Sequence, residues 1–226
     1  MSGILFVVAT PIGNLGDITL RALETLKSCD KIIAEDTRVT KKLLDRYEIR
    51  KPLISLRARS ARAAFERVAA LVEEGETLVY VTDAGTPGIS DPGPLLVSLV
   101  REKCGEAAVV PIPGAAAVTA AVSAAGIPID EFTFVGFLPH KKGRQKMLDT
   151  LVAEKRAAVL YESPHRMKKL LDELSARVPE RSLVIARELT KLHEQIAAGT
   201  VRELAERYAT GDISPKGEFV VILGAA

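Results

Sequence analysis

Two adjacent carboxylates stand where a proton acceptor could be placed. Glu35 and Asp36 directly follow an apolar segment that is typical of a buried strand, and Arg38 comes two residues later. A carboxylate held at a substrate hydroxyl can accept its proton, and a neighbouring cation can lower the pKa of that hydroxyl. A simpler role is also open, because Asp36 or Thr37 could merely cap the helix that is expected next.

A loop rich in glycine and proline, Asp83–Gly93, follows another apolar segment. Gly85 and Gly88 would let the backbone approach a ligand closely, although turn formation alone would also account for this composition. The loop is longer than a plain connection between a strand and a helix needs. In Pro113–Val118 a Pro-Gly turn opens an alanine-rich helix, which either admits a flat ring or packs tightly against a sheet.

Two further polar clusters, Tyr161–Arg166 and Ala186–Lys191, also follow apolar strands. A lone histidine such as His165 is more often structural than catalytic. The carboxyl ends of parallel strands meet at one edge of a sheet, so we expect the clusters at these ends to converge on a site.

Basic side chains are locally dense although the net charge is only +2. One such cluster alone is most often a solvated face, but three of them near the expected site loops fit a polyanionic substrate. The three clusters are Arg57, Arg59, Arg62 and Arg67; Lys141, Lys142, Arg144 and Lys146; and Arg166, Lys168 and Lys169.

Several classes of protein find no support in the sequence. It contains no P-loop, no GxGxxG dinucleotide fingerprint and no GxSxG nucleophile turn. The two cysteines are far apart in sequence and the three histidines form no HExxH pattern, so we expect neither a disulfide scaffold nor a metal site. No apolar run is long enough to span a membrane and no targeting segment is visible, which predicts a soluble cytoplasmic protein.

Apolar runs and helical periodicity alternate along the whole chain, which predicts an α/β fold. We expect two domains, 1–112 and 113–226, each a mostly parallel sheet flanked by helices. Asp17 is the expected cap of the first helix, and Thr190–Gly199 is expected to be a polar segment between a strand and a helix. The predicted strands are 4–10, 31–35, 53–56, 77–82, 108–112, 132–137, 157–161, 183–187 and 218–223. The predicted helices are 18–28, 37–47, 61–74, 94–103, 115–125, 144–153, 166–178 and 201–208.

Eight ordered motifs resemble the tetrapyrrole-methylase superfamily of S-adenosylmethionine-dependent methyltransferases. Within it, they are most similar to the family of ribosomal RNA small-subunit methyltransferase I. The resemblance extends over nearly the whole chain and is therefore specific. The motifs are Thr10–Thr19, Ala34–Arg38, Asp83–Gly93, Pro113–Ala117, Gly136–Arg144, Tyr161–Arg166, Ala186–Lys191 and Lys216–Glu218.

The resemblance implies a homodimer of two-domain subunits, with S-adenosylmethionine bound in the cleft between the domains. The implied reaction is 2′-O-methylation of a cytidine ribose in 16S ribosomal RNA of the small subunit. By motif, the cofactor contacts carried over are Pro11, Asp83, Ala84, Gly85, Thr86, Ile89, Ala116, Ala117, Glu162 and Glu188.

Catalytic and RNA-binding candidates follow from the same motifs and from the basic clusters. Asp36 and Glu35 are the candidate bases, and Arg38, Arg166 and Lys216 are the candidate cations. The expected RNA contacts are Arg57, Arg59, Arg62, Lys141, Arg144 and Arg166. In one stretch the chain departs from the family, because residues 56–62 read LRARSAR where the family carries histidine or asparagine and glutamate.

Two alternatives remain beside this interpretation. A methyltransferase of the same superfamily could act on a tetrapyrrole or another small molecule, but the motif wording and the basic clusters disfavour it. A non-catalytic module that binds an adenosyl ligand would need the cofactor loops but not the carboxylates of Glu35 and Asp36.

Overall fold

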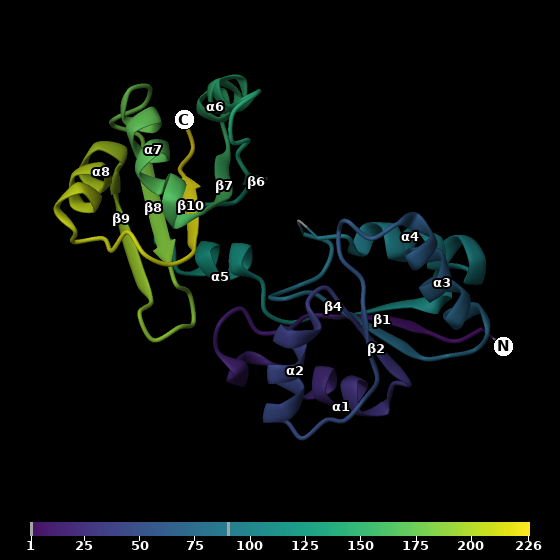
Figure 1. The fold of residues 1–226 in the computed structure, drawn as a ribbon. Helices are drawn as coiled ribbons and strands as arrows, with labels where there is room; N and C mark the ends of the chain where they lie inside the picture. Colours follow the sequence, from purple (N-terminus) through teal and green to yellow (C-terminus); the bar gives the residue numbers. More distant parts are fainter. Residues whose placement is uncertain (1, 90) are drawn as a thin grey trace. The chain divides into compact units, whose positions relative to one another are not determined.

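The computed structural model describes residues 2–89 and 91–226. The chain divides into two compact units, residues 1–116 and 117–226, where the sequence predicted a division after residue 112 (Figure 1). Each unit contains one five-stranded sheet with its own helices.

The first unit is built on a fully parallel sheet of strand order β3-β2-β4-β1-β5. Its strands are β1 Leu5–Val8, β2 Lys31–Ala34, β3 Leu53–Ser55, β4 Leu78–Val81 and β5 Val109–Ile112. Its helices are α1 Leu20–Ser28, α2 Thr37–Arg46, α3 Arg62–Glu73 and α4 Gly93–Cys104, with 3₁₀ turns η1 Leu15–Asp17 and η2 Glu106–Ala108.

Helices cover both faces of this sheet, which explains why its central strands read as continuous apolar runs. On one face Leu26 of α1 and Leu44 of α2 pack with Ile32 and Val79. On the other face, α3 and α4 pack against the sheet (Figure 1). The helices that follow β1 and β4 therefore leave the sheet on opposite sides. In parallel sheets this arrangement opens a crevice at the carboxyl ends of the two strands.

The cap of the first helix differs from the predicted Asp17, whereas the cap of α2 is one of the two predicted candidates. Asp17 lies in η1, and the cap of α1 is Thr19, whose hydroxyl accepts a hydrogen bond from the backbone N–H of Ala22 at 3.1 Å. Asp36, the residue before Thr37, is the cap of α2. Both caps satisfy backbone donors that the helix leaves unpaired.

The second unit has a mixed sheet of strand order β6-β7-β10-β8-β9. Its strands are β6 Phe132–Phe137, β7 Ala157–Glu162, β8 Ser182–Arg187, β9 Gln195–Thr200 and β10 Phe219–Leu223. Its helices are α5 Ala117–Ser123, α6 Arg144–Ala153, α7 Pro164–Ser175 and α8 Val201–Thr210.

The α/β class is confirmed, but the prediction of a mostly parallel second sheet is wrong. Only β6 and β7 pair in parallel, whereas β10 runs antiparallel to β7 and to β8, and β8 runs antiparallel to β9. The cause is β9, which begins within the segment Thr190–Gly199 that was expected only as a polar segment. A short connection without a helix can only join antiparallel strands, so β9 and the later β10 run opposite to β8.

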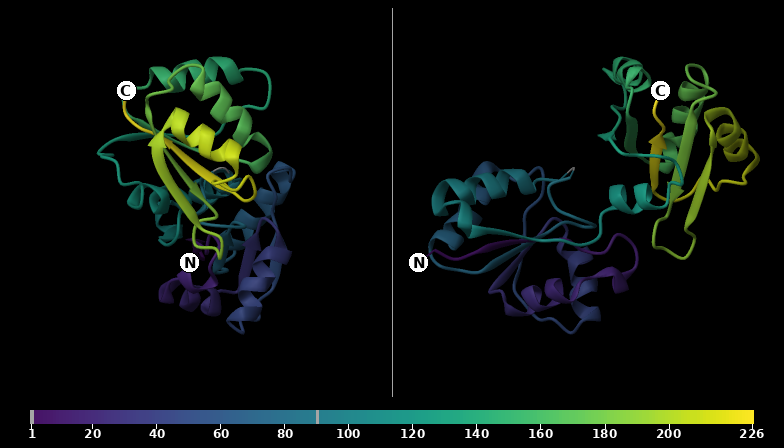
Figure 2. Two further views of the ribbon diagram at one scale, coloured as in Figure 1. Left: turned by 90° about the vertical axis from the view of Figure 1, so that its left-hand side faces the viewer. Right: turned by 180° about the vertical axis from the view of Figure 1, so that it is seen from behind.

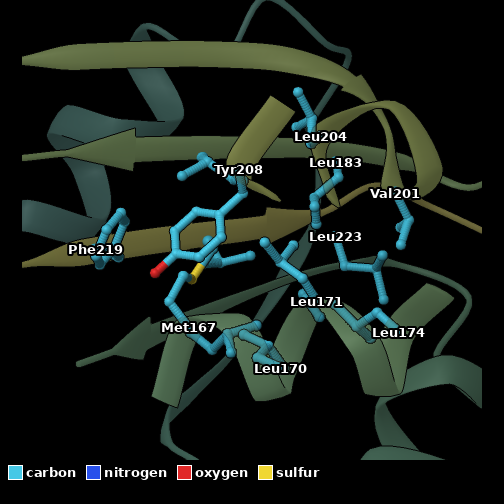
Figure 3. Close-up of a cluster of buried hydrophobic side chains, with 14 of the residues drawn as sticks. Met167, Leu170, Leu171, Leu174, Leu183, Val201, Leu204, Tyr208, Phe219 and Leu223 are labelled. Carbon is cyan, nitrogen blue, oxygen red and sulfur yellow. The ribbon is translucent and has the colours of Figure 1, made fainter. Parts of the chain in front are cut away.

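The core of the second unit lies between its sheet and three helices. Leu170, Leu171 and Leu174 of α7 face Leu183 and Leu223 of the sheet (Figure 3). Val201, Leu204 and Tyr208 of α8 belong to the same cluster. Leu148 and Leu151 of α6, the third helix, also belong to it. The two views of Figure 2 show α7 and α8 side by side over this face. This packing fixes the ends of β7, β8 and β10, where several predicted site residues lie.

Candidate active site at the carboxyl end of the first sheet

The loops that follow β1 and β4 are joined by a pair of backbone hydrogen bonds. The N–H of Thr10 donates to the carbonyl of Gly85, and the N–H of Gly85 donates back to Thr10, both at 3.0 Å. The Thr86 hydroxyl donates to the carbonyl of Ala115 at 3.0 Å, which adds the segment that follows β5. Three of the predicted cofactor segments therefore form one surface, at the crevice expected from the strand order.

Gly85 is required for this junction. Its φ of +81° lies in the left-handed region, and a Cβ there would lie 3.2 Å from Cγ2 of Ile12 and 3.6 Å from the Ala115 carbonyl. The close approach predicted from the sequence is thus used to join the protein's own loops. Asp83 and Ala84 are exposed beside it, so their surface remains open to a ligand.

Asp91, which was not among the predicted site residues, organises the remainder of the glycine-rich loop. Its carboxylate accepts hydrogen bonds from the backbone N–H groups of Gly88 at 2.6 Å, Ile89 at 2.9 Å and Gly93 at 2.7 Å. The hydroxyl of Tyr80 donates to the same carboxylate at 3.2 Å. An aspartate two residues before a glycine is a known turn signal, which could have identified it. Ser90, within this loop, lies outside the described residues.

Glu35 lies close to three other carboxylates. Burial raises its pKa, and the negative charges of Asp83, Asp91 and Asp36 raise it further. A carboxylate whose pKa is moved toward neutral pH is a more effective proton acceptor at that pH. Glu35, Asp36 and Asp83 come from the ends of β2 and β4, which the parallel register places next to each other, and Asp91 comes from the loop before α4.

Asp36 has the opposite electrostatic environment. Its carboxylate accepts hydrogen bonds from the side chain of Arg38, at 3.0 Å to Nε, and from the backbone N–H of Arg38 at 2.9 Å. These bonds hold the pKa of Asp36 well below its usual range. Asp36 is therefore a weak proton acceptor at neutral pH. Its role as the N-terminal cap of α2 explains why an aspartate stands at this position. Arg38 itself is exposed.

Arg57, Arg59 and Arg62 are exposed beyond the carboxyl end of β3, as a phosphate-binding group requires. A turn presents the first two, because the backbone N–H of Arg57 donates to the Ser60 hydroxyl at 3.0 Å. Arg62 is paired with Glu66 at 2.9 Å, one turn further along α3. Because of this ion pair, we expect Arg62 to contribute less than Arg57 or Arg59 to the binding of an anion.

Arg144 does not lie on the surface, although it was expected to contact RNA. Its side chain is only 2% exposed, and its Nη2 atom lies 2.7 Å from Oε2 of Glu173. Glu162, expected at the cofactor, is fully buried with its carboxylate 2.6 Å from Nη2 of Arg166. Buried charges must be paired, so these residues build a network inside the second unit. The structure presents neither Arg144 nor Glu162 to a ligand.

This buried network holds a basic loop. Arg166 donates to the carbonyl of Leu138 at 2.8 Å, and Arg144 donates to the carbonyl of Pro139 at 3.4 Å. Lys141, directly beyond, is exposed as predicted for an RNA contact. The arginines of two separate motifs thus fix the backbone that presents this lysine.

Glu188 and Lys216 come together at the ends of β8 and β10. The Glu188 carboxylate accepts hydrogen bonds from Nζ of Lys191 and from the backbone N–H of Glu218, both at 2.9 Å. Burial raises the pKa of Glu188, but these bonds outweigh it and lower the pKa overall. Lys216 is exposed beside this cluster.

Neither a metal centre nor a membrane span emerges from the part of the chain that the structure describes. Over residues 2–89 and 91–226, no group of three or more histidine, cysteine, aspartate or glutamate side chains could hold a metal ion. Over the same residues, no helix is long and apolar enough to cross a membrane.

Comparison with known proteins identifies the family. A model of the tetrapyrrole (corrin/porphyrin) methylases matches residues 5–205. Among curated proteins, the ribosomal RNA small subunit methyltransferase I of Synechocystis sp. is 48% identical over 228 residues, which cover 99% of this chain and 80% of that protein.

Solved structures share the fold at lower identity. The methyltransferase CobJ is 21% identical with a TM-score of 0.71, over 100% of this chain and 95% of that one. A uroporphyrin-III C-methyl transferase from Thermus thermophilus, solved with S-adenyl homocysteine, is 18% identical with a TM-score of 0.66, over 98% of this chain and 97% of that one. These matches confirm the resemblance found in the sequence motifs. The chain belongs to the tetrapyrrole methylase family and, within it, to the ribosomal RNA small subunit methyltransferases I.

Proposed function

We propose that this protein transfers a methyl group from S-adenosylmethionine to the 2′-hydroxyl of a cytidine ribose in 16S ribosomal RNA of the small subunit. The observation that carries the proposal is the near-full-length similarity to proteins named ribosomal RNA small subunit methyltransferase I. The exposed arginines after β3 fit a polyanionic substrate of this kind.

The loops of the first unit suit the cofactor. Its sulfonium group is a cation, and the carboxylates of Glu35, Asp36 and Asp83 gather at the same sheet edge. Small residues leave room beside them for the flat adenosyl group. We propose that the cofactor site of this unit is formed by Pro11, Asp83, Ala84, Gly85, Thr86, Ile89 and Ala116. Gly85 acts there by joining the loops, as the hydrogen bonds with Thr10 indicate.

S-adenosylmethionine, when bound, supplies an electrophilic methyl group, so the protein's main tasks are orientation and removal of one proton. A ribose hydroxyl is a poor nucleophile near neutral pH. We assign proton acceptance to the carboxylate of Glu35, because its raised pKa suits that task better than the lowered pKa of Asp36. The exposed Arg38 is a candidate for stabilising negative charge on the ribose oxygen.

Methyl transfer from labelled cofactor tests the function directly. The three acceptors, assayed in parallel, are purified 30S subunits, free 16S RNA and a tetrapyrrole. We expect label in the RNA of at least one of the first two, at a cytidine 2′-oxygen. Transfer to the tetrapyrrole alone would favour a small-molecule methyltransferase. Cofactor binding without any transfer would favour a non-catalytic module.

The family resemblance also leads us to propose a homodimer that works in the cytoplasm, where ribosomal RNA is its substrate. Light scattering on the purified protein measures the mass in solution. A dimer has twice the 24.3 kDa of one chain. A monomeric mass at micromolar concentration would refute the homodimer and leave the activity unaffected.

A further inference from the structure

The motifs Ala186–Lys191 and Lys216–Glu218 form one cluster in the second unit. The backbone N–H of Glu188 donates to the carbonyl of Glu218 at 2.9 Å, which extends the antiparallel pairing of β8 and β10 by one step. Nζ of Lys191 bridges the two carboxylates, at 2.9 Å from Glu188 and 2.8 Å from Glu218. The side chain of Glu188 is thereby held at several points.

The backbone of this cluster is strained. Glu188 has a φ of +49° and Thr190 a φ of +67°, in the left-handed region that side chains rarely adopt. The Glu188 side chain packs directly against the backbone of Gly217, which has a φ of +103°. A Cβ at Gly217 would lie 2.4 Å from Cγ of Glu188. Only glycine fits that position. Strained residues persist where their surroundings over-determine them, and they concentrate at functional sites.

A buried arginine, Arg187, also holds the backbone of this cluster. Arg187 is 8% exposed, and its guanidinium donates to the carbonyl of His193 at 2.6 Å and to the carbonyl of Lys216. The carbonyl of Lys216 is therefore fixed by Arg187, while the next residue, Gly217, is fixed by Glu188. Two charged side chains thus hold the backbone of one exposed lysine.

The side chain of Lys216 is free to bind an anion. It is exposed, and among the described residues its ammonium group forms no ion pair, whereas Lys191 nearby is paired with two carboxylates. A lysine ammonium is a compact point charge on a flexible side chain, which suits a phosphate group, and a rigid backbone limits the region that this charge can reach. We infer that Arg187 and Glu188 are positioning residues that hold Lys216 for a phosphate of the RNA backbone. The inference rests on the proposed RNA substrate.

The assignment of Glu188 differs from the direct cofactor contact that the family resemblance implies. Its Oε1 atom already accepts two hydrogen bonds, and its side chain is only 19% exposed. A carboxylate engaged in this way is better suited to fixing its neighbours than to binding a ligand of its own.

A double-mutant cycle tests the inference. Lys216→Ala, Glu188→Gln and the double variant are compared for affinity to 30S subunits at several salt concentrations, for cofactor affinity by calorimetry and for thermal stability. We expect Lys216→Ala to weaken RNA binding several-fold and to reduce the slope of log K against log salt by about 0.7–0.9, as for one lost phosphate contact. Its cofactor affinity and stability should match wild type. Lys27→Ala, an exposed lysine in α1, is the control and should behave as wild type.

The double variant decides the role of Glu188. If Glu188 acts through Lys216, then the single variant Glu188→Gln weakens RNA binding. In the double variant it adds no further loss to that of Lys216→Ala. Losses that simply add, or a loss of cofactor affinity in Glu188→Gln, would overturn the positioning role. Unchanged RNA binding in Lys216→Ala would overturn the phosphate contact. Wild-type protein that binds cofactor but transfers no methyl group to RNA would instead refute the proposed function.

Discussion

The backbone N–H of Asp36 donates a hydrogen bond to the carboxylate of Asp83 at 2.9 Å, which ties the end of β2 to the end of β4. The two residues belong to different sequence motifs, and the parallel register of β2 and β4 brings them together. The bond keeps the Asp83 charge near Glu35, whose pKa it helps to raise. The pKa of Glu35, in the motif Ala34–Arg38, therefore depends partly on Asp83 in the motif Asp83–Gly93.

Glu35→Gln should lower the rate of methyl transfer more than Asp36→Asn does. Removing a positioned base typically costs about 10²–10⁴-fold in rate. Asparagine caps a helix nearly as well as aspartate, so Asp36→Asn should retain the fold and a rate within a few-fold of wild type. Single-turnover assays at saturating cofactor measure both rates. A large loss in Asp36→Asn with a near-normal Glu35→Gln would exchange their roles.

Glu35→Gln should also change the pH dependence of stability. The folded-state pKa of Glu35 is raised by burial and by neighbouring carboxylates, so the folded state favours the protonated form. Protonated Glu35 therefore contributes stability to the folded state. That contribution is present below the pKa of Glu35 in the unfolded chain and is lost as pH rises through its pKa in the folded protein. The variant should gain stability over wild type at pH 8 and gain none at pH 3.5. Urea denaturation at the two pH values measures this, and an equal difference at both would contradict it.

Gly85→Ala should weaken cofactor binding at least tenfold. The new Cβ would lie 3.2 Å from Ile12, so the junction between the loops must shift. Gly126→Ala is the matched control, because Gly126 also has a positive φ, +66°, but a Cβ there meets nothing within 4 Å. Calorimetry, and the rise in melting temperature on adding S-adenosylmethionine, measure the effect. Equal cofactor affinities in the two variants would contradict the prediction, because the junction between the loops would then not be needed for cofactor binding.

Replacing Arg57, Arg59 and Arg62 together by alanine should weaken binding to 30S subunits and flatten its salt dependence. Each lost phosphate contact reduces the slope of log K against log salt by about 0.7–0.9. Arg62 is already paired with Glu66, so restoring Arg62 alone should recover little. Cofactor affinity serves as the control. Unchanged RNA affinity at low salt would identify these arginines as an ordinary solvated face.

Arg144→Met should destabilise the protein by about 3–5 kcal/mol, the usual effect of leaving a buried charge without its partner. Methionine keeps the apolar volume of the side chain but leaves Glu162 and Glu173 without Arg144. Lys168→Met is the control, since its exposed pair with Asp172 should contribute only about 0–1 kcal/mol. Urea denaturation compares them. Wild-type stability with weakened RNA binding would place Arg144 in the RNA interface after all.

The sequence by itself determined the α/β alternation, the parallel first sheet and the family. Local patterns decide these features: short apolar runs such as Leu78–Val81, bounded by turn residues, are typical of strands buried on both faces. The glycine-rich loop was also predictable, because positive φ angles such as that of Gly85 limit the residue type. The residues of the motifs and their order along the chain are sufficient to identify the family.

Tertiary structure alone decided the roles of the charged residues. Arg62 and Arg144 both stand in basic clusters, yet only Arg144 is buried, because Glu162 and Glu173 reach it from β7 and α7. Burial and pKa depend on neighbours that are distant along the chain, as Asp83 and Asp91 are for Glu35. The direction of β10 depended in the same way on the β8–β9 hairpin, whose small residues give little strand signal. Local sequence carries no information about which distant charges a fold brings together.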